Sequence, residues 1–482
     1  MGFSDVTRIW LRGKDRRTRP LRVVALALVA ALVASACSGD GDSSVLAEPD
    51  AEPAGIGSRG ETLVAAPSVP TGPMDDDVAA VLDHIVAAWM DNEEPDPERI
   101  AELGRSGDPR IGWIMADLIL VRPRGHQTIS GLRDAFETLT GATIDPPRTW
   151  ASATDHLIAW DLASNDEYLD WKQRIYTQLE PLWEPFFEDA DADVDWRQVA
   201  WGGVFLDDRV DGHGTNCERT CIPSLDDPAV VTGVDGDWLR DDRIVFGVVV
   251  EGEARAYPRH ILEAHEMVND DLGGRRIGLP YCSLCGSAQA YITDDVPEGI
   301  ETPVLRTSGL LTRSNKVMFD LVTNSLFDTF TGRAITGPLH DKEFSLTQIP
   351  VITSTWGDWK AEHPNTSIVA HDGGVGLAYP LAPLAERDRN GPIFAVGDVD
   401  PRLEVMEPVL GATNADGVAV AFPVEAARAA LDAGETIEFE GLVVVGEGSG
   451  IRAELADGTR LATHQAFWFA WSQFNPDTLV WS

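Results

Sequence analysis

The sequence predicts an α+β protein, with a helical region at the N-terminus and a mainly antiparallel β domain after it. Three observations support this fold class. Residues 76–140 carry apolar side chains at helical spacing, residues after about 240 form short β-prone runs broken by glycine and aspartate, and part of this second pattern occurs twice. The chain has 482 residues, 44% of them hydrophobic, which is enough for two or three domains with real cores.

The net charge excludes one class of partner. The 78 acidic and 38 basic residues give a net charge of −40 at pH 7, and such a surface repels the phosphates of nucleic acid. The sequence also has no Gly-rich phosphate loop, no G-x-S-x-G and no H-E-x-x-H motif. It therefore offers no basis for an NTPase, a lipase-type enzyme or a zincin.

Residues 1–36 are expected to be a lipoprotein signal peptide. A basic start leads into the apolar stretch VVALALVAALVASAC, which is short for a membrane span. Its ASAC ending resembles a lipobox, with Cys37 as the first mature residue and the site of lipid attachment. An ordinary cleaved signal and an uncleaved anchor are the alternatives. In all three cases we expect the mature protein outside the cytoplasmic membrane. If it is a lipoprotein, we expect lipid on Cys37 to anchor it to that membrane.

Two segments precede the predicted β domain. Residues 37–75 are rich in Gly, Ser, Pro, Ala and acid, which predicts a flexible tether. Residues 76–200 are expected to form a helical, Trp-rich region. Within it, PERIAELGRSGDPRIGWIMADLIL follows a helix–break–helix pattern that resembles a HEAT-type pair. The dense aromatic residues from 150 to 201 are expected to form a core where this region joins the next, because aromatic stripes usually pack.

Residues 201–400 are expected to form the core of the protein. Runs such as RIVFGVVVEGEARAYP and NKVMFDLVTN alternate in polarity and end in turn residues, which predicts an antiparallel sheet or sandwich. One helix is expected in PRHILEAHEMVND. Ile261, Leu262, His265 and Val268 share one face there, so His265 is expected to point inward with the apolar side chains.

Residues 401–482 are expected to be a second, shortened copy that packs on the first. GEARAYP at 252–258 recurs as GVAVAFP at 417–423, and TWGDWKAEHPNTSIV at 355–369 recurs as FWFAWSQFNPDTLVW at 467–481. The tryptophans of the second pair of segments keep one offset of 112 residues. Because the second copy lacks cysteine, the chemistry is expected in the first.

The five cysteines divide into one single residue and two close pairs. With Cys37 assigned to lipid, two pairs remain in an oxidising compartment. Cys217 and Cys221 are expected to form a structural disulfide in an exported loop. Cys282 and Cys285, within LPYCSLCGSAQAY, are compatible with a redox pair, half of a metal site or a structural disulfide.

Seven segments, in order along the chain, together resemble the DUF3179 family over roughly residues 200–482: GEARAYP, HEMVNDDLGG, YCSLCGSAQAY, SGLLTRSNKVMFD, SLFDTFTGRAITGPL, TSTWGDWKAEHPNTSIV and QAFWFAWSQFNPDT. Members of this family are typically exported proteins of bacteria and archaea without an assigned biochemical role. Some carry selenocysteine in the C-x-x-C position, which implies redox chemistry at Cys282 and Cys285. The resemblance also implies that Cys217 and Cys221 are local additions to the family pattern.

The principal functional prediction is a thiol–disulfide or related redox activity that requires no cofactor. Cys282 is expected to attack the partner and Cys285 to resolve the mixed disulfide. His265 is expected to accept a proton, and Arg275 or Arg276 to stabilise the thiolate. The partner is expected to be an unidentified protein or small molecule with redox chemistry.

Two alternatives remain open at this point. In the first, Cys282, Cys285 and His265 bind zinc or copper, with Cys217, Cys221 and His213 as further candidate ligands. In the second, the protein is a non-enzymatic binding module and the same cysteines form a structural disulfide.

Overall fold

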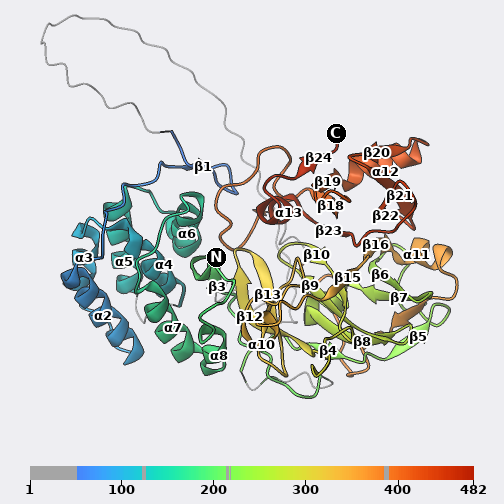
Figure 1. The fold of residues 1–482 in the computed structure, drawn as a ribbon, viewed down its shortest axis with the longest axis horizontal. Coiled ribbons are helices and arrows are strands. Elements are labelled where there is room, and N and C mark those ends of the chain that lie inside the picture. Colours follow the sequence, from blue (N-terminus) through green and yellow to red (C-terminus); the bar gives the residue numbers. More distant parts are fainter. Residues whose placement is uncertain (1–51, 122–125, 213–216, 218, 385–389) are drawn as a thin grey trace, which may run out of the picture.

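The structure is a computed structural model that describes residues 52–121, 126–212, 217, 219–384 and 390–482. The predicted signal peptide, Cys37 and His213 lie outside the described residues. After a short hairpin, the described chain forms helices and then continues into a region of small sheets (Figure 1). Among the described helices, none is long and apolar enough to cross a membrane.

Two short strands lie before residue 76, inside the segment expected to be a flexible tether. β1 (Gly55–Ile56) and β2 (Thr62–Leu63) form an antiparallel hairpin. Leu63 is 1% exposed, and Gly57 forms a β-bridge with Asp398, more than three hundred residues away in the chain. The tether boundary at 75 is therefore corrected, because this hairpin buries apolar surface against the folded body.

An N-terminal helical region is present, as predicted, and it extends from Asp76 to Gln198. The α-helices are α2 (Asp76–Met90), α3 (Pro97–Arg105), α4 (Gly112–Val121), α5 (His126–Thr140), α6 (Thr149–Ala159), α7 (Tyr168–Leu179) and α8 (Glu184–Phe187). Short 3-10 helices lie between or after them: η1 (Pro109–Ile111), η2 (Pro146–Arg148), η3 (Pro181–Trp183) and η4 (Trp196–Gln198). Aspartates cap several N-termini; the side chain of Asp75, for example, accepts from the backbone N–H of Asp77 at the start of α2.

Every residue of α4 is buried, so this helix forms the centre of the helical region. α3 packs on α5, and α4 packs on α6 and α7. The HEAT-type character of these helices stays a prediction. The tryptophans act as core, as expected: Trp183 is 0% exposed and donates its Nε1–H to Ser308 O at 2.9 Å, in the neighbouring β domain.

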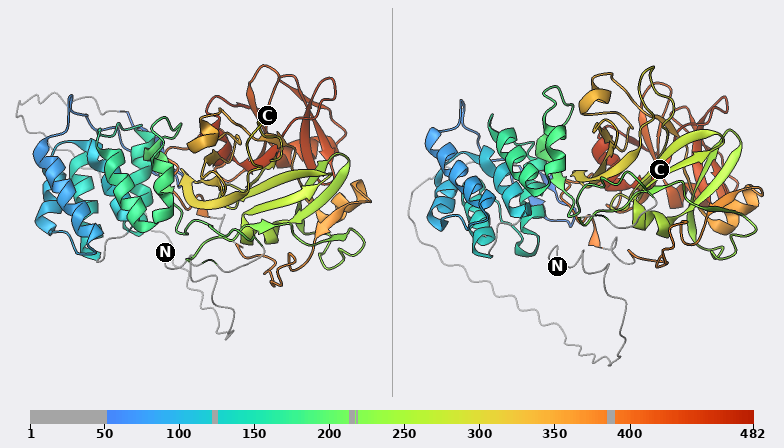
Figure 2. Two further views of the ribbon diagram at one scale, coloured as in Figure 1. Left: turned by 60° about the horizontal axis from the view of Figure 1, so that its bottom comes forward. Right: turned by 90° about the horizontal axis from the view of Figure 1, so that it is seen from below.

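In the described residues, five small sheets follow the helices in a propeller-like ring. Figure 2 shows the sheets, coloured yellow-green to red, beside the N-terminal helices, coloured blue to green. The linking sheet has the order β14 (Leu326–Asp328), β13 (Asn315–Asp320), β12 (Leu305–Thr312), β3 (Val199–Trp201). The thiol sheet has the order β15 (Thr347–Ile349), β11 (Ala290–Ile292), β9 (Arg275–Cys282), β8 (Met267–Leu272), β4 (Leu225–Asp226), and β10 (Ser287–Ala288) also pairs with β9. Most strand pairs are antiparallel, as predicted for this domain.

The remaining three sheets include two that contain the repeated Trp segments. The first Trp sheet has the order β16 (Ile352–Thr355), β6 (Ile244–Val250), β7 (Glu253–Pro258), β17 (Ser367–Val369), β5 (Val230–Thr232). The second Trp sheet has the order β23 (His464–Phe467), β18 (Pro408–Thr413), β19 (Ala419–Pro423), β24 (Leu479–Val480). The small sheet has the order β20 (Ile437–Phe439), β21 (Leu442–Glu447), β22 (Gly450–Leu455).

Helices of four to nine residues connect these strands. They are α9 (Arg259–His265), α10 (Gly337–His340), α11 (Trp356–Glu362), α12 (Val424–Asp432) and α13 (Trp468–Phe474). The helix predicted in PRHILEAHEMVND is shorter than expected, because Glu266 adopts a left-handed conformation and ends α9. The chain then enters β8 directly.

The two Trp sheets share their strand order and pairing. β16 and β6 pair antiparallel, as do β23 and β18; β7 and β17 pair parallel, as do β19 and β24. A helix follows β7 and another follows β19, each beginning after a proline. The second Trp sheet contacts the first through β16 and β23, and it contacts the thiol sheet through β10 and β23. It therefore lies against the strands that carry Cys282 and Cys285.

Candidate functional site

The cysteine pair lies in a tight turn at one end of the thiol sheet. Cys282 ends β9, and the backbone N–H of Cys285 donates to Cys282 O at 3.2 Å. Ser287 then pairs with Cys282 across the antiparallel ladder. Gly286 has a φ of +62°, and a Cβ there would lie 2.8 Å from the ring of Phe467. Glycine fits this position for both reasons.

Both sulfur atoms point to the same acceptor. Cys282 Sγ lies 3.7 Å and Cys285 Sγ 3.4 Å from Ser314 O, in the turn between β12 and β13. Neither cysteine is in a disulfide, so the pair is in its dithiol form. The linking sheet and the thiol sheet therefore meet at these two sulfur atoms.

Several hydrogen bonds are directed at the sulfur of Cys282. Burial alone raises the pKa of Cys282, but hydrogen bonds from the Cys285 thiol and from the backbone N–H groups of Lys316 and Cys285 outweigh it. The pKa of Cys282 therefore lies below that of an ordinary cysteine, although the charge of Glu266 acts in the opposite direction. Of the two cysteines, Cys282 has the surroundings of a nucleophile.

Both thiols are covered. Cys282 is 1% and Cys285 0% exposed, and both belong to an apolar cluster with Phe330, Trp468 and Phe469. Residues 284 and 286 of the same turn are only half-buried. The sulfur atoms thus lie immediately beneath a turn that reaches the surface.

A buried lysine lies near the cysteine turn. Lys316 on β13 is 4% exposed, and its Nζ donates to Glu266 O at 2.5 Å. The carboxylate of Glu266 accepts from Ser283 Oγ, also at 2.5 Å, so the same residue contacts the cysteine turn and the lysine. Burial lowers the pKa of Lys316, while the negative charges of Glu266, Cys282 and Asp207 oppose this effect.

His265 points inward, as predicted, but its hydrogen bonds lead away from the thiols. Nδ1 lies 2.6 Å from Pro223 O, and Nε2 lies 2.6 Å from the hydroxyl of Tyr379. Nδ1 therefore donates and Nε2 accepts. Burial lowers the pKa of His265 to about 4, so the ring is neutral at pH 7. These contacts give no support to His265 as the proton acceptor of Cys282.

The two arginines expected to stabilise the thiolate are engaged elsewhere. Arg275 forms a salt bridge with Asp294 at 2.8 Å, and Arg276 forms a salt bridge with Asp227. The structure instead brings Lys316, 34 residues further along the chain, to Cys282 through its backbone N–H. The sequence analysis missed this lysine and Glu266, because no local motif connects them to the cysteines.

The expected disulfide between Cys217 and Cys221 is present, with Cα atoms 5.8 Å apart. The carboxylate of Asp207 and both sulfur atoms lie within 4.8 Å of one another. Sulfur binds metals as thiolate, so this group would become a metal site only after reduction of the disulfide. The structural role of the Cys217–Cys221 disulfide stays a prediction.

The geometry around Cys282 and Cys285 provides two candidate metal ligands. Within the described residues, no third His, Cys, Asp or Glu brings a ligand atom within 4.8 Å of both sulfur atoms. His265 in particular does not complete a site with them. A second cluster, formed by Asp189, His340 and Asp341, lies at the surface, and Asp189 there accepts from Gly337 N at 2.7 Å.

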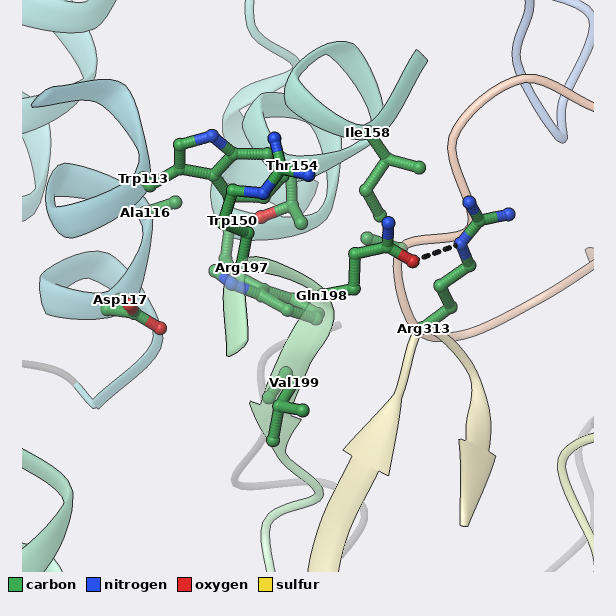
Figure 3. A pocket seen from close by; sticks show the side chains of 12 residues that line it. Trp113, Ala116, Asp117, Trp150, Thr154, Ile158, Arg197, Gln198, Val199 and Arg313 are labelled. Atoms are coloured by element: carbon green, nitrogen blue, oxygen red, sulfur yellow. Dashed lines mark hydrogen bonds between the residues drawn. The ribbon is translucent and has the colours of Figure 1, made fainter. Parts of the chain in front are cut away.

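A small cavity lies where the helical region meets the linking sheet. Its volume is about 10 Å³, room for about one water molecule. Figure 3 shows its lining, including Thr154, Arg197 and the hydrogen bond from Arg313 Nε to Gln198 Oε1 of 2.8 Å. A larger hollow lies near Glu407 and Arg428. Neither lining includes the cysteines. In the described part of the chain, the buried thiol pair is the strongest candidate site because both sulfur atoms meet at Ser314 O.

The fold and site define a mixed helix and sheet protein, in which a ring of small sheets encloses a dithiol beside a buried lysine. The chain belongs to the family described as "Protein of unknown function (DUF3179)", whose model matches residues 219–478. This confirms the resemblance found in the sequence, and Cys217–Cys221 lies at the start of the matched region. Neither a curated protein nor a solved structure gave a match to the chain.

Proposed function

We propose that Cys282 and Cys285 form a thiol–disulfide exchange site that cycles between a dithiol and a disulfide. The observation that carries this proposal is the convergence of both sulfur atoms on Ser314 O, with additional N–H donors directed at one of them. Donors of this kind favour a thiolate, and a thiolate is the form that attacks a disulfide.

The asymmetry of the pair supports a division of roles. Cys282 attacks one sulfur of the partner disulfide, a new S–S bond forms, and the other partner sulfur leaves as a thiolate. Cys285 then loses its proton and attacks Cys282 Sγ, which releases the second partner sulfur. The partner gains two electrons and two protons, and the protein is left with the Cys282–Cys285 disulfide. The partner is a disulfide-containing protein or small molecule.

Access to Cys282 requires a movement, because both thiols are covered by the second Trp sheet and α13. We infer that this sheet is a shortened copy of the first Trp sheet, as the shared strand order suggests. It carries no cysteine, and its role in this proposal is to cover the dithiol. The half-buried residues 284 and 286 are the part of the turn nearest to an incoming partner.

The same proposal includes anchoring outside the cytoplasmic membrane through lipid on Cys37. Its support is the basic and apolar segment that ends in ASAC. Mass spectrometry of the mature protein tests it: we expect an N-terminal Cys37 that carries acyl mass. A mature N-terminus elsewhere, or an unmodified Cys37, would reject the anchor and leave the redox proposal intact.

Thiol trapping across a series of redox buffers tests the exchange site. We expect Cys282 and Cys285 to interconvert reversibly with a midpoint above about −300 mV, the value below which structural disulfides usually lie. Cys217–Cys221 in the same samples is the internal control, and we expect it to stay oxidised. In Cys285→Ser, the mixed disulfide on Cys282 should accumulate, since no second thiol resolves it.

Three results would reject the exchange site. One is a Cys282–Cys285 disulfide that resists reduction below about −300 mV, which would make it structural. Another is stoichiometric zinc or copper in native protein, lost in Cys282→Ser, which would favour the metal-binding alternative. The third is a dithiol that never oxidises, as expected for a binding module.

A further inference from the structure

A segment that is neither helix nor strand leads toward the second Trp sheet. It comprises residues 394–399, and we call it the strap. Phe394 and Ala395 at its start pack in the core of the helical region. Val396, the next residue, packs in the apolar cluster that contains both thiols. The strap therefore passes from the helical region to the apolar cover of the dithiol.

Buried backbone groups need hydrogen-bond partners, and those of the strap come from two helices that are far apart in the sequence. Asp155 Oδ1 on α6 accepts from the backbone N–H of Val396 at 2.8 Å and of Gly397 at 3.0 Å. Gln473 Nε2 on α13 donates to Val396 O at 3.1 Å. Val396 is thus bonded to the helical region through its N–H and to the covering helix through its C=O.

The strap lies close against α6 and continues into a second contact with α13. Gly397 has a φ of +81°, and a Cβ there would lie 2.5 Å from Cγ2 of Ile158 on α6, so glycine suits this close approach. Just after the strap, Asp400 O accepts from Trp468 Nε1 at 2.9 Å. Trp468 itself packs in the cluster around the thiols. The strap and α13 therefore form one connected unit over the dithiol.

The bond from Asp155 is strong on one side and incomplete on the other. The residue is 1% exposed, and its Oδ2 lies 3.6 Å from Arg148 Nη2. Among the described residues, neither of these two atoms has a hydrogen-bond partner. Burial raises the pKa of Asp155 to about 7, although both strap N–H groups and Arg148 oppose this effect. Opening would give water to both unpaired atoms, which reduces its cost.

We propose that Asp155 is a latch that holds the strap, and with it α13, closed over Cys282 and Cys285. When its two bonds to the strap break, the strap and α13 move away together and the thiols become accessible. The helical region thereby controls access to the dithiol. This inference rests on the proposed exchange site, because it names the device that regulates access to it.

The test is the rate at which a neutral reagent alkylates Cys282 and Cys285 in the native, reduced full-length protein, measured by mass spectrometry. We expect Asp155→Ala to raise this rate by at least about tenfold, because two buried N–H groups lose their acceptor and the closed form is weakened. Asp155→Asn keeps an oxygen that can accept from both N–H groups, so its rate should stay close to that of the wild type.

Asp320→Ala is the matched control. Asp320 is 0% exposed, and its Oδ1 likewise accepts from two backbone N–H groups, those of Val304 at 2.9 Å and Val322 at 3.2 Å. It ends β13, whereas Ser314 and the thiols lie at the start of this strand. We expect its alkylation rate to equal that of the wild type.

Gln473→Ala tests the other end of the same connection. It removes the bond from α13 to Val396, so we expect faster alkylation in this variant as well, and this variant carries the test if Asp155→Ala does not fold. Because the two contacts act in series, Asp155→Ala combined with Gln473→Ala should be no faster than the faster single variant.

Three results would overturn the latch: an unchanged rate in Asp155→Ala or Gln473→Ala, equal acceleration in Asp155→Ala and Asp320→Ala, or effects that multiply in the double variant. The redox titration of the dithiol separates this inference from the exchange site. Reversible cycling without any effect of Asp155 would reject the latch alone. Faster alkylation in Asp155→Ala with a dithiol that does not cycle would support the latch and reject the exchange site.

Discussion

Trp359 and Trp471 make the same contacts in two different sheets. Each indole donates its Nε1–H to the threonine seven residues further on, Thr366 or Thr478, at 2.9 Å. Each ring also packs against a strand glycine, Gly247 on β6 or Gly411 on β18. The two glycines leave the space that the two indoles fill. In each Trp sheet, one indole from a neighbouring helix therefore covers the glycine of one strand.

Replacement of either glycine by alanine should destabilise its sheet. A Cβ at Gly247 would overlap the Trp359 ring, and a Cβ at Gly411 would overlap the Trp471 ring. Overpacking of this kind usually lowers the free energy of unfolding by about 1–3 kcal/mol. We expect lower thermal midpoints for Gly247→Ala and Gly411→Ala, measured by circular dichroism.

Gly446→Ala is the control for both variants. This glycine is also in a strand, β21, but a Cβ there would meet only Nη1 of Arg428, at 3.2 Å. A flexible side chain can move away, so we expect a small effect. Equal losses in all three variants would mean that strand propensity, and not the indole, decides the effect.

The sequence indicated the likeness of these two tryptophan segments, and their origin as an internal repeat stays a prediction. The tryptophans could be aligned by their common offset, because a helix that packs on a strand keeps the same spacing wherever it occurs. The inward direction of His265 followed from helical periodicity in the same way. These predictions depend on local spacing, which one sequence contains.

The surroundings of the thiols depend on tertiary contacts that local spacing in the sequence does not predict. Lys316 reaches Cys282 because the linking sheet packs on the thiol sheet, and no spacing rule connects the two strands. Arg275 and Arg276 were expected at the thiolate because they precede it on the same strand, yet their side chains bind Asp294 and Asp227 near the other end of that strand. Tertiary contacts thus determine which residues surround the thiols.

A buried polar network connects the helical region to the linking sheet. Lys172 Nζ donates to Asp117 Oδ1 at 2.9 Å and to Val199 O at 2.7 Å, and the hydroxyls of Tyr168 and Tyr176 also donate to Asp117. Asp117→Ala would leave Lys172 as an uncompensated buried charge. We expect a loss of about 3–5 kcal/mol in the free energy of unfolding, measured by urea denaturation.

The control for Asp117→Ala is an ion pair at the surface of the same region. Asp83 and Arg174 form a salt bridge of 2.9 Å, with side chains 59% and 41% exposed. Arg174→Ala removes this pair and keeps the hydrogen bond from the Trp171 indole to Asp83, so it should change the free energy of unfolding by about 1 kcal/mol or less. If Asp117→Ala costs no more than this, the network does not hold the helical region on the sheet.

His464 should make the protein sensitive to mild acid. Burial lowers its pKa to about 4, from an ordinary value of 6.5. Between these two values the unfolded chain binds a proton that the folded chain does not, so stability falls as the pH is lowered through this window. From pH 7 to pH 5 the loss due to this residue is about 2 kcal/mol.

Urea denaturation of His464→Gln at pH 7 and pH 5 measures this contribution. The variant cannot take up the proton, so we expect it to lose about 2 kcal/mol less than the wild type over this interval. His371→Gln, at an exposed position, serves as control and should keep the wild-type dependence. The same pH dependence in all three proteins would contradict a buried neutral His464.

Phe467 should control the access of reagents to the thiols. It lies at the end of β23, its ring lies close to Gly286, and its backbone N–H donates to Cys285 O at 2.8 Å. Phe467→Ala removes the ring but keeps this hydrogen bond. If the covering segment loses about 1.4 kcal/mol of stability, the open form becomes about tenfold more populated. We therefore expect about tenfold faster alkylation of Cys282 and Cys285 in native, reduced protein, measured by mass spectrometry.

Phe439→Ala is the control for this variant, because it removes another half-buried ring, on β20, which packs near Phe422 in a different part of the domain. Its alkylation rate should equal that of the wild type. Equal acceleration in both variants would point to a general loss of stability, and no acceleration in Phe467→Ala would mean that another segment covers the dithiol.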